Sequence, residues 1–230
     1  MLQLRKSLYG LKQSGRLWSQ LLHARLLEAG FRQCISDLCL YWQVEGGQLV
    51  IVGVYVDDLL ATGTDAAAVD RFFVKLGSLA IKYLVTVSKY LGMRVTIDNS
   101  GGYVLDQAEA IGELLREHGL EDANSTKAPI GADCYDVLPD DSALLTATKM
   151  PGAPTIKTFQ SLVGNLLRVA RCTWPDIAFA VHKATRQTHQ PLLHDMKLAK
   201  RNARYLKGTR NYKLRIKRAK DLDAKIKLEA

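Results

Sequence analysis

Hydrophobic and polar positions follow two different periods in the first part of the chain. Over residues 16–29, apolar side chains recur every three or four positions, which predicts an amphipathic helix that Gly30 is placed to end. Residues 39–44 and 48–56 are rich in strand-forming side chains and flank the turn signal Gly46-Gly47. These two segments therefore predict a pair of antiparallel strands.

A third apolar segment, residues 59–62, follows directly after the pair Asp57-Asp58. Two acidic residues between two apolar strands predict a tight hairpin with carboxylates at its tip. Asp65 then has the character of a helix N-cap, and the apolar positions after it predict a helix over residues 65–76.

The pattern continues with residues 89–97, which are strand-like, and a short strand over residues 103–105 after a glycine turn. Residues 107–118 predict a helix that ends at Gly119. Residues 121–157 show no period and hold many Asp and Pro residues, which predicts a loop or linker.

Helical periodicity returns in the last part of the chain. Three helices are predicted over residues 158–171, 175–189 and 191–208, with Pro175 in a first turn. The fold class that follows is α+β, with an antiparallel sheet and packed helices first and a helical lobe second.

Charge adds a feature that the hydrophobic pattern does not contain. The 230 residues carry a formal net charge of +9, and 47% of them are hydrophobic, which is typical of a globular chain. Residues 197–230 hold 13 basic and 3 acidic side chains, whereas the rest of the chain is nearly neutral. A basic end of this kind indicates either a polyanionic partner or a solvated tail.

Several classes of protein are disfavoured by the sequence. Its longest central apolar run, residues 49–56, is far shorter than the roughly 20 residues that a membrane-spanning helix needs. The N-terminus has no apolar signal region, so we expect a protein of the cytoplasm or nucleus that is not secreted.

No two cysteines have the C-x-x-C spacing, which favours free thiols. A zinc site of Cys172, His182, His189 and His194 fits no common ligand spacing, so histidines in the core or at the surface are favoured.

The strongest local candidate for chemistry is Tyr55-Val56-Asp57-Asp58 within its apolar frame. Two carboxylates at a rigid turn can bind hard divalent cations such as Mg²⁺. Because neighbouring strand residues point to opposite sides, we expect Asp57 to be the main ligand and Asp58 the secondary one. A solvated Asp-Asp turn is the alternative for so short a motif.

Five further blocks stand around this box in a fixed order. They are Leu8-Tyr-Gly-Leu-Lys-Gln-Ser-Gly-Arg-Leu-Trp18, Tyr90-Leu-Gly-Met-Arg-Val95, Ser161-Leu-Val-Gly-Asn-Leu-Leu167, Pro175-Asp-Ile-Ala-Phe-Ala-Val181 and Arg204-Tyr-Leu-Lys-Gly-Thr209. With the box, they resemble the reverse transcriptase region of copia-type LTR retrotransposons over residues 4–214. Five blocks in register are far more specific than the four-residue box alone.

The resemblance implies a right-hand polymerase fold that carries out template-directed, two-metal transfer of dNTPs to a primer 3′ end. Residues 1–120 would be part of the palm and fingers, 121–157 an acidic linker, 158–212 a helical thumb-like region, and 213–230 a basic end. The implied cofactor is Mg²⁺ or Mn²⁺, and the implied partners are an RNA or DNA primer–template and dNTPs, with no membrane.

The same resemblance assigns roles to particular residues. Asp57 and Asp58 would be catalytic metal ligands; Lys12, Gln13 and Tyr55 would contact nucleotide or template; Leu91, Gly92 and Met93 would grip the primer; and Lys200, Arg201, Arg204, Lys207, Arg210 and Lys213 would contact the nucleic-acid backbone. Each assignment has a simpler alternative. Lys12 and Gln13 fit a solvated loop, Gly92 fits an ordinary strand kink, and the basic run fits a solvated helix face.

The chain also departs from the family pattern. A further catalytic aspartate of the family lies on a palm strand upstream of the first block, and the acids before Asp57, namely Glu28, Asp37 and Glu45, do not match it. We therefore expect an incomplete metal site, an exposed sheet edge and an isolated chain without activity. The RNase H, integrase and protease segments of the family are also absent from these residues.

Smaller departures are consistent with drift in a degraded element. Ser14-Gly15 stands where the family usually has Ala-Pro, Arg168 where it has Tyr, and Trp174 where it has Arg. Two other hypotheses therefore stand beside the polymerase fragment. The chain would be a nucleic-acid-binding remnant without chemistry, or a decayed reading frame with no selected function.

Overall fold

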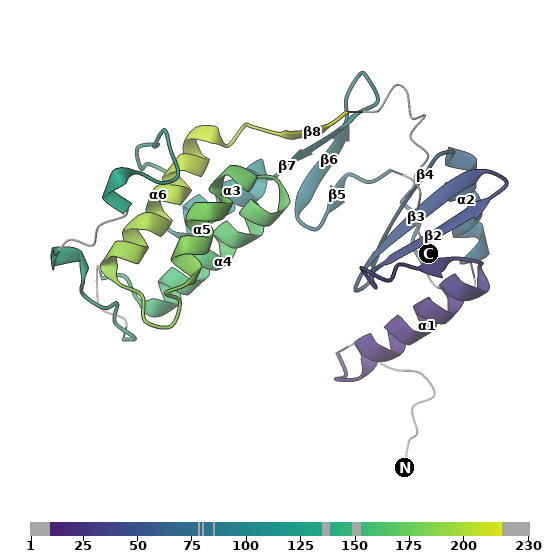
Figure 1. The fold of residues 1–230 in the computed structure, drawn as a ribbon, viewed down its shortest axis with the longest axis horizontal. Coiled ribbons are helices and arrows are strands. Elements are labelled where there is room, and N and C mark those ends of the chain that lie inside the picture. Colours follow the sequence, from purple (N-terminus) through teal and green to yellow (C-terminus); the bar gives the residue numbers. More distant parts are fainter. Residues whose placement is uncertain are drawn as a thin grey trace, which may run out of the picture. The chain divides into compact units, whose positions relative to one another are not determined.

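The computed structural model describes residues 10–77, 79, 81–84, 86–134, 139–148 and 153–217. The chain forms two compact units, unit 1 over Met1–Thr86 and unit 2 over Val87–Ala230 (Figure 1). Leu8 and Tyr9 of the first block, and residues 218–230 of the basic end, lie outside the described residues.

Unit 1 is a four-stranded antiparallel sheet with two helices. Its elements are α1 (Ser14–Glu28), β1 (Arg32–Gln33), β2 (Leu40–Glu45), β3 (Gln48–Tyr55), β4 (Asp58–Gly63) and α2 (Ala66–Lys75). The strands lie in the order β1-β2-β3-β4, so β3 is central and β4 is the last strand at one side. Within the described residues, the outer edge of β4 pairs with no strand.

The core of unit 1 lies on one face of this sheet. Tyr41 pairs with Val52 across β2 and β3, so both side chains point to the same face, and Val52 is fully buried there. Leu26 of α1 and Phe72 of α2 complete the same cluster. Because both helices cover one face, the opposite face stays partly exposed to solvent.

Unit 2 combines a second antiparallel sheet with a helical lobe. Its elements are β5 (Lys89–Tyr90), β6 (Met93–Ile97), β7 (Tyr103–Asp106), α3 (Ala108–Glu117), η1 (Ala132–Cys134), η2 (Pro139–Asp141), α4 (Ile156–Cys172), η3 (Pro175–Ile177), α5 (Ala178–Thr185), α6 (Leu193–Thr209) and β8 (Leu214–Ile216). The strand order is β5-β6-β7-β8, and β8 returns from the end of α6 to pair with β7.

The core of unit 2 is formed by the facing sides of α3, α4, α5 and α6 (Figure 1). Phe159 and Leu166 of α4 are fully buried, as is Leu206 of α6. Thr155 caps α4, because its hydroxyl accepts a hydrogen bond from the backbone N–H of Thr158. In the described part of the chain, no helix has the length and apolar character needed to cross a membrane.

The predicted α+β class is confirmed, and most predicted helices and strands lie within a few residues of their observed bounds. Three features differ from the prediction. Residues 89–97, which the apolar pattern alone predicts as one strand and the family resemblance as a hairpin, form the hairpin of β5 and β6. Leu91 and Gly92 both have positive φ and reverse the chain there. The short strands β1 and β8 lie where no strand was predicted.

The boundary between the two compact units does not coincide with a boundary between the segments named in the sequence analysis. The division falls at residue 86 instead of 120, because α3 packs against α4 and α6 and belongs to the helical core. The predicted linker 121–157 lies inside unit 2, where Leu145 donates a backbone hydrogen bond to Pro191 and Leu193 donates one to Ala143. The assignment of palm, fingers and thumb to these segments stays a prediction.

Candidate active site

The two adjacent acids of the central motif lie at the tip of the β3–β4 hairpin. Tyr55 pairs with Asp58, which leaves Val56 and Asp57 as a two-residue turn. Val56 has a φ of 51°, in the left-handed region that a β-branched residue rarely occupies. Backbone strain of this kind is often concentrated at functional turns, where the surrounding structure maintains it.

Both carboxylates of this turn are exposed to solvent. Asp57 lies in the turn itself, whereas Asp58 is the first residue of β4. Leu59, the next residue, packs against the core, so alternation along the strand places Asp58 on the opposite, exposed face. Exposed carboxylate oxygens are suitable donors for Mg²⁺.

The donor set at this turn consists of two acids. Across the described residues, no group of three or more His, Cys, Asp or Glu side chains is close enough to hold a metal ion. The zinc site considered in the sequence analysis is therefore not formed, because Cys172, His182, His189 and His194 do not gather in one place.

Helix α1 fixes the position of the hairpin tip. The indole Nε1 of Trp18 donates a hydrogen bond of 3.0 Å to the backbone carbonyl of Val56. The ring of Trp18 also packs against the core of unit 1. Trp18 is a positioning residue that the sequence analysis did not single out, although it ends the first of the five blocks and lies on the apolar face of the predicted helix.

The predicted nucleotide contacts lie in the same unit as the two acids. Lys12 and Gln13 are exposed in the turn that leads into α1, and Gln13 is the N-cap residue. Gln13 precedes Trp18 by five residues, which is about 7.5 Å along a helix axis. Tyr55 is the last residue of β3 and is 55% exposed, so its ring is accessible beside the turn.

The predicted primer-gripping residues form the tip of the β5–β6 hairpin in unit 2. Tyr90 pairs with Met93, and the turn between them consists of Leu91 and Gly92, with φ of 51° and 79°. A side-chain carbon added at Gly92 would lie 3.7 Å from Nη1 of Arg168 in α4. The structure therefore places a cation of the helical lobe beside this turn, which the sequence analysis did not foresee.

Three of the six predicted backbone-contacting cations hold another segment of the protein. Residues 123–128, which we call the strap, run along the C-terminal half of α6. Arg204 donates from Nε to the carbonyl of Asn124 at 2.6 Å, and Lys207 donates to that of Ala123 at 2.9 Å. Arg201 donates from Nε to the carbonyl of Ala128. These bonds orient the cations but leave their positive charge intact.

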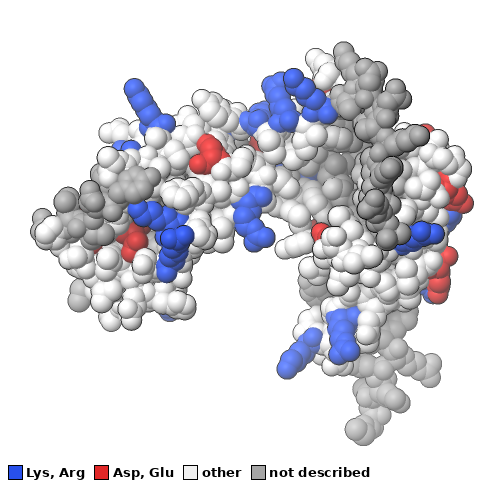
Figure 2. Space-filling view, in the orientation of Figure 1, with Lys and Arg blue, Asp and Glu red and all other residues white. Residues whose placement is uncertain are grey.

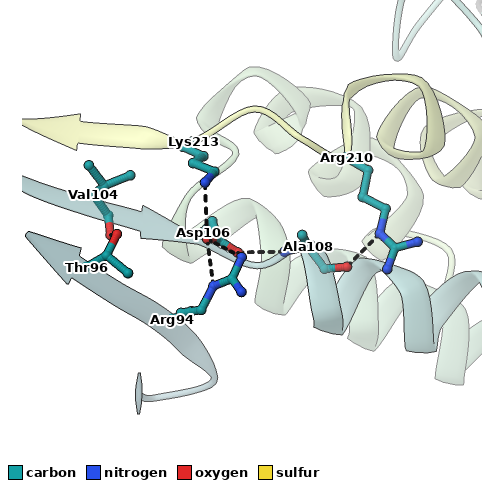
Figure 3. Close-up of polar contacts among 7 residues, drawn as sticks. All are labelled: Arg94, Thr96, Val104, Asp106, Ala108, Arg210 and Lys213. Atoms are coloured by element: carbon teal, nitrogen blue, oxygen red, sulfur yellow. Dashed lines mark hydrogen bonds and ion pairs between the residues drawn. The ribbon is translucent and has the colours of Figure 1, made fainter. Parts of the chain in front are cut away.

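The other predicted cations lie at different places on unit 2. Lys200 is exposed on α6. Arg210 donates from Nε to the carbonyl of Ala108 at 2.8 Å, and Nζ of Lys213 lies 4.0 Å from the carboxylate of Asp106 (Figure 3). The six cations therefore extend from the middle of α6 to the connection with β8.

Asp106 organises a polar cluster on the second sheet. Its side chain is 3% exposed and accepts two hydrogen bonds from Arg94, from Nε at 3.0 Å and from Nη2 at 3.2 Å. It also accepts one from the backbone N–H of Ala108 in the first turn of α3 (Figure 3). With Lys213, two cations surround one carboxylate, so the cluster has a net positive charge.

The sequence model of the family described as "Reverse transcriptase (RNA-dependent DNA polymerase)" matches residues 1–132. That range includes Asp57, Asp58 and the β5–β6 hairpin. No solved structure matches the chain.

Curated relatives match almost the whole chain. A retrovirus-related Pol polyprotein from transposon RE1 of Arabidopsis thaliana is 31% identical over 96% of this chain, which spans 14% of that polyprotein. A putative transposon Ty5-1 protein of Saccharomyces cerevisiae is 29% identical over 94% of this chain and 67% of its own length. A Pol polyprotein from transposon TNT 1-94 of Nicotiana tabacum is 28% identical over 90% of this chain and 16% of its own length.

Proposed function

Because the chain belongs to the reverse transcriptase family of copia-type retrotransposon Pol polyproteins, we propose that it is part of an RNA-directed DNA polymerase of right-hand fold. In this proposal, unit 1 contributes Asp57 and Asp58 to template-directed nucleotidyl transfer. The observation that supports it is the β3–β4 hairpin, which presents two exposed carboxylates on a turn that Trp18 holds in place.

The two acids have distinct roles in this proposal. Asp57, in the turn, is the main ligand of a divalent cation, and Asp58, on the exposed face of the sheet, is the secondary one. A bound Mg²⁺ or Mn²⁺ would supply charge neutralisation for the substrate phosphates and activation of the primer 3′ hydroxyl. The strained turn at Val56 and its hydrogen bond to Trp18 keep the carboxylates positioned before any ligand arrives.

We further propose that the site needs a carboxylate from outside the described residues. Two-metal transfer requires ligands that bracket both ions, and within the described part of the chain no third acid joins Asp57 and Asp58. The unpaired edge of β4 next to these acids would accept a further strand. In this proposal, the described residues therefore do not complete a two-metal site by themselves.

The remaining contacts follow the two hairpins and the basic helix. Lys12, Gln13 and Tyr55 would contact the incoming nucleotide or the template from unit 1. Leu91, Gly92 and Met93 would contact the primer, with Arg168 available to a primer phosphate. The cations of α6 would contact the nucleic-acid backbone of an RNA or DNA primer–template.

Primer extension with purified protein tests the catalytic part of this proposal. The 230-residue chain should bind Mn²⁺ weakly and incorporate no dNTP onto a primed template. A longer protein that adds, in frame, a strand with a catalytic aspartate should incorporate dNTPs in Mg²⁺ or Mn²⁺. Asp57→Asn in the longer protein should lower incorporation by at least a hundredfold, because a metal ligand is lost.

Asp65→Asn is the matched control for this experiment. Asp65 is an acid of the same unit at the N-cap of α2, and Asn is an equally good N-cap residue, so this variant should retain activity and stability. Incorporation by the 230-residue chain that Asp57→Asn abolishes would contradict the proposed incompleteness. Full activity of the longer protein carrying Asp57→Asn would contradict the metal-ligand role itself.

A non-catalytic nucleic-acid-binding role is the second candidate. It is favoured by residues 210–217, which are exposed and contain four basic residues and no acidic one. Binding of a primer–template by the chain, with no incorporation by any longer protein, would support this candidate over the polymerase. Affinity that does not change with salt would contradict both, because phosphate contacts release counterions.

A further inference from the structure

Two stacked aromatic side chains lie where α6 ends. Trp174, between α4 and η3, is 4% exposed and belongs to the core of unit 2, whereas Tyr212, just after α6, is 66% exposed. Their rings are nearly parallel, at an interplanar angle of 7° and a centroid distance of 6.1 Å. Trp174 therefore supports Tyr212 from inside, and most of the Tyr212 ring remains open to solvent.

The backbone around Tyr212 is also held in place. Its N–H donates a hydrogen bond of 2.8 Å to the carbonyl of Thr209 at the end of α6. A neighbouring tyrosine, Tyr205, donates its hydroxyl hydrogen to the carboxylate of Asp176, and this bond raises the pKa of Tyr205 to about 12. The Tyr212 ring is thus held in place by Trp174 and by its backbone hydrogen bond, so little conformational entropy is lost when a ligand stacks on it.

Basic residues flank Tyr212 along the chain. Arg210 and Lys213 stand on either side of Tyr212 in the sequence, and Arg215 and Lys217 follow on β8 and beyond it. Figure 2 shows Lys and Arg side chains gathered over the part of unit 2 that contains β8. The cluster at Asp106 does not cancel this charge, since its single carboxylate already faces both Arg94 and Lys213.

Arg210 is held in a defined orientation. Its Nε donates to the carbonyl of Ala108 (Figure 3). Its guanidinium lies over Gly112 of α3, where an added side-chain carbon would lie 2.5 Å from Nη2. Gly112 thus provides the space that the guanidinium occupies. Because only Nε is used in this bond, the Nη1 and Nη2 groups can donate a pair of hydrogen bonds to a phosphate.

We propose that Tyr212, with Arg210 and Lys213, forms a subsite for one unpaired nucleobase of a single-stranded nucleic acid. The base stacks on the open face of the tyrosine ring, and the flanking phosphates contact the two cations. This inference rests on the proposed nucleic-acid-binding function and adds a preference for single strands. In a duplex, both faces of each internal base are already stacked, so the ring has no face to contact.

Binding of a fluorescein-labelled oligothymidylate to the full chain, followed by anisotropy, tests the subsite. Tyr212→Ala should weaken binding about tenfold, because one base–aromatic stack is lost. Tyr212→Phe should bind like the unmodified chain. Tyr212→Leu, which keeps an apolar contact on Trp174 but has no aromatic face, should bind as weakly as the alanine variant.

Phe179→Ala is the matched control, because Phe179 is an aromatic residue of the same unit with a similar exposure of 63%. It should leave the affinity unchanged. The dependence on salt separates stacking from charge. Tyr212→Ala should keep the slope of log affinity against log salt, whereas Lys213→Gln should reduce its magnitude by about 0.7 for a single strand.

Each possible result has a defined meaning. Unchanged affinity of Tyr212→Ala for a strand that the chain binds would overturn the subsite and leave the proposed function intact. No binding of any nucleic acid by the unmodified chain would contradict the proposed nucleic-acid function as well. Equal affinity for the oligothymidylate and for polyglutamate would identify a general polyanion surface and overturn the subsite.

Discussion

Val56 and Leu91 occupy equivalent positions in the two hairpins that carry the predicted metal-binding and primer-contacting residues. Each has a φ of 51°, in a region that glycine adopts easily and that Val and Leu rarely occupy. Val56 directly precedes Asp57, and Leu91 directly precedes Gly92. At the residue scale, the non-glycine residues with positive φ in the described part of the chain thus lie in the two turns to which the sequence assigned chemistry.

His118, at the end of α3, should make the stability of unit 2 depend on pH. Its side chain is 4% exposed and its Nε2 has no hydrogen-bond partner among the described residues. Burial lowers the pKa of the imidazole from its usual 6.5; Glu117 raises it less, and Lys200 adds to the lowering. Below pH 6.5 the unfolded chain therefore binds a proton that the folded chain does not, and the free energy of unfolding should fall.

Urea unfolding at pH 7.5 and 5.5 measures this effect. His118→Gln should reduce the loss of stability between the two pH values, whereas His189→Gln, which removes an exposed imidazole of the same unit, should not. The same loss in the unmodified chain and in His118→Gln would contradict the assignment. The lowered pKa of Glu117 acts in a separate window, below its usual value of 4.5.

At the scale of elements, the strap and α6 explain why cations that were predicted to contact nucleic acid also contact protein. Thr126 of the strap donates its backbone N–H to the carbonyl of Arg204, while Arg204 donates to Asn124. Gly208 lets the strap approach the helix, since a side-chain carbon there would lie 2.9 Å from Cβ of Ser125. Periodicity predicts the helix α6 and composition shows that it is basic, but neither indicates which surface the cations face.

Two glycines in helices should respond in opposite ways to alanine. Gly164→Ala in α4 meets nothing within 4 Å, so it should stabilise the chain by about 0.5–1 kcal/mol through helix propensity. Gly208→Ala in α6 gains the same propensity but displaces the strap, so it should destabilise the chain by about 1–3 kcal/mol. Denaturant unfolding monitored by circular dichroism compares the two variants. Stabilisation by both would show that the strap is not packed against Gly208.

Several elements could be located from sequence because their signals are local. The helix over residues 107–118 ends at Gly119, and Gly119 indeed has a positive φ of 62°. Strand β8 was not predicted, because its partner in β7 lies more than one hundred residues earlier, as the pairing of Tyr103 with Ile216 shows. Three residues of alternating pattern carry no signal without that partner.

At the scale of the whole molecule, each unit has its own hydrophobic core. The core around Leu26 contains only residues of unit 1, and the core around Leu166 contains only residues of unit 2. Both leucines are fully buried. We therefore expect the two units to unfold in separate transitions that respond to different substitutions.

Alanine substitutions in the two cores test this expectation. Leu26→Ala and Leu166→Ala should each cost about 2–5 kcal/mol, and each should lower only the transition of its own unit in calorimetry. Their neighbours Leu27 and Leu167, at 47% and 37% exposed, provide matched controls whose replacement by Ala should cost much less. A single transition that both core substitutions lower equally would contradict the two-unit organisation.

The sequence by itself determined the family and the α+β class, and it nominated the pair Asp57-Asp58 as the candidate site. The ordered blocks, the periods of apolar residues and the apolar frame of that pair are all visible along the chain without any tertiary contact. Only the tertiary structure decided that residues 87–120 belong with the helical lobe, that Trp18 holds the hairpin tip, and that Trp174, an apparent product of drift, supports Tyr212. These three results depend on contacts between residues far apart in the sequence. Such contacts form because burial and hydrogen bonding act between whichever surfaces the folded chain brings together.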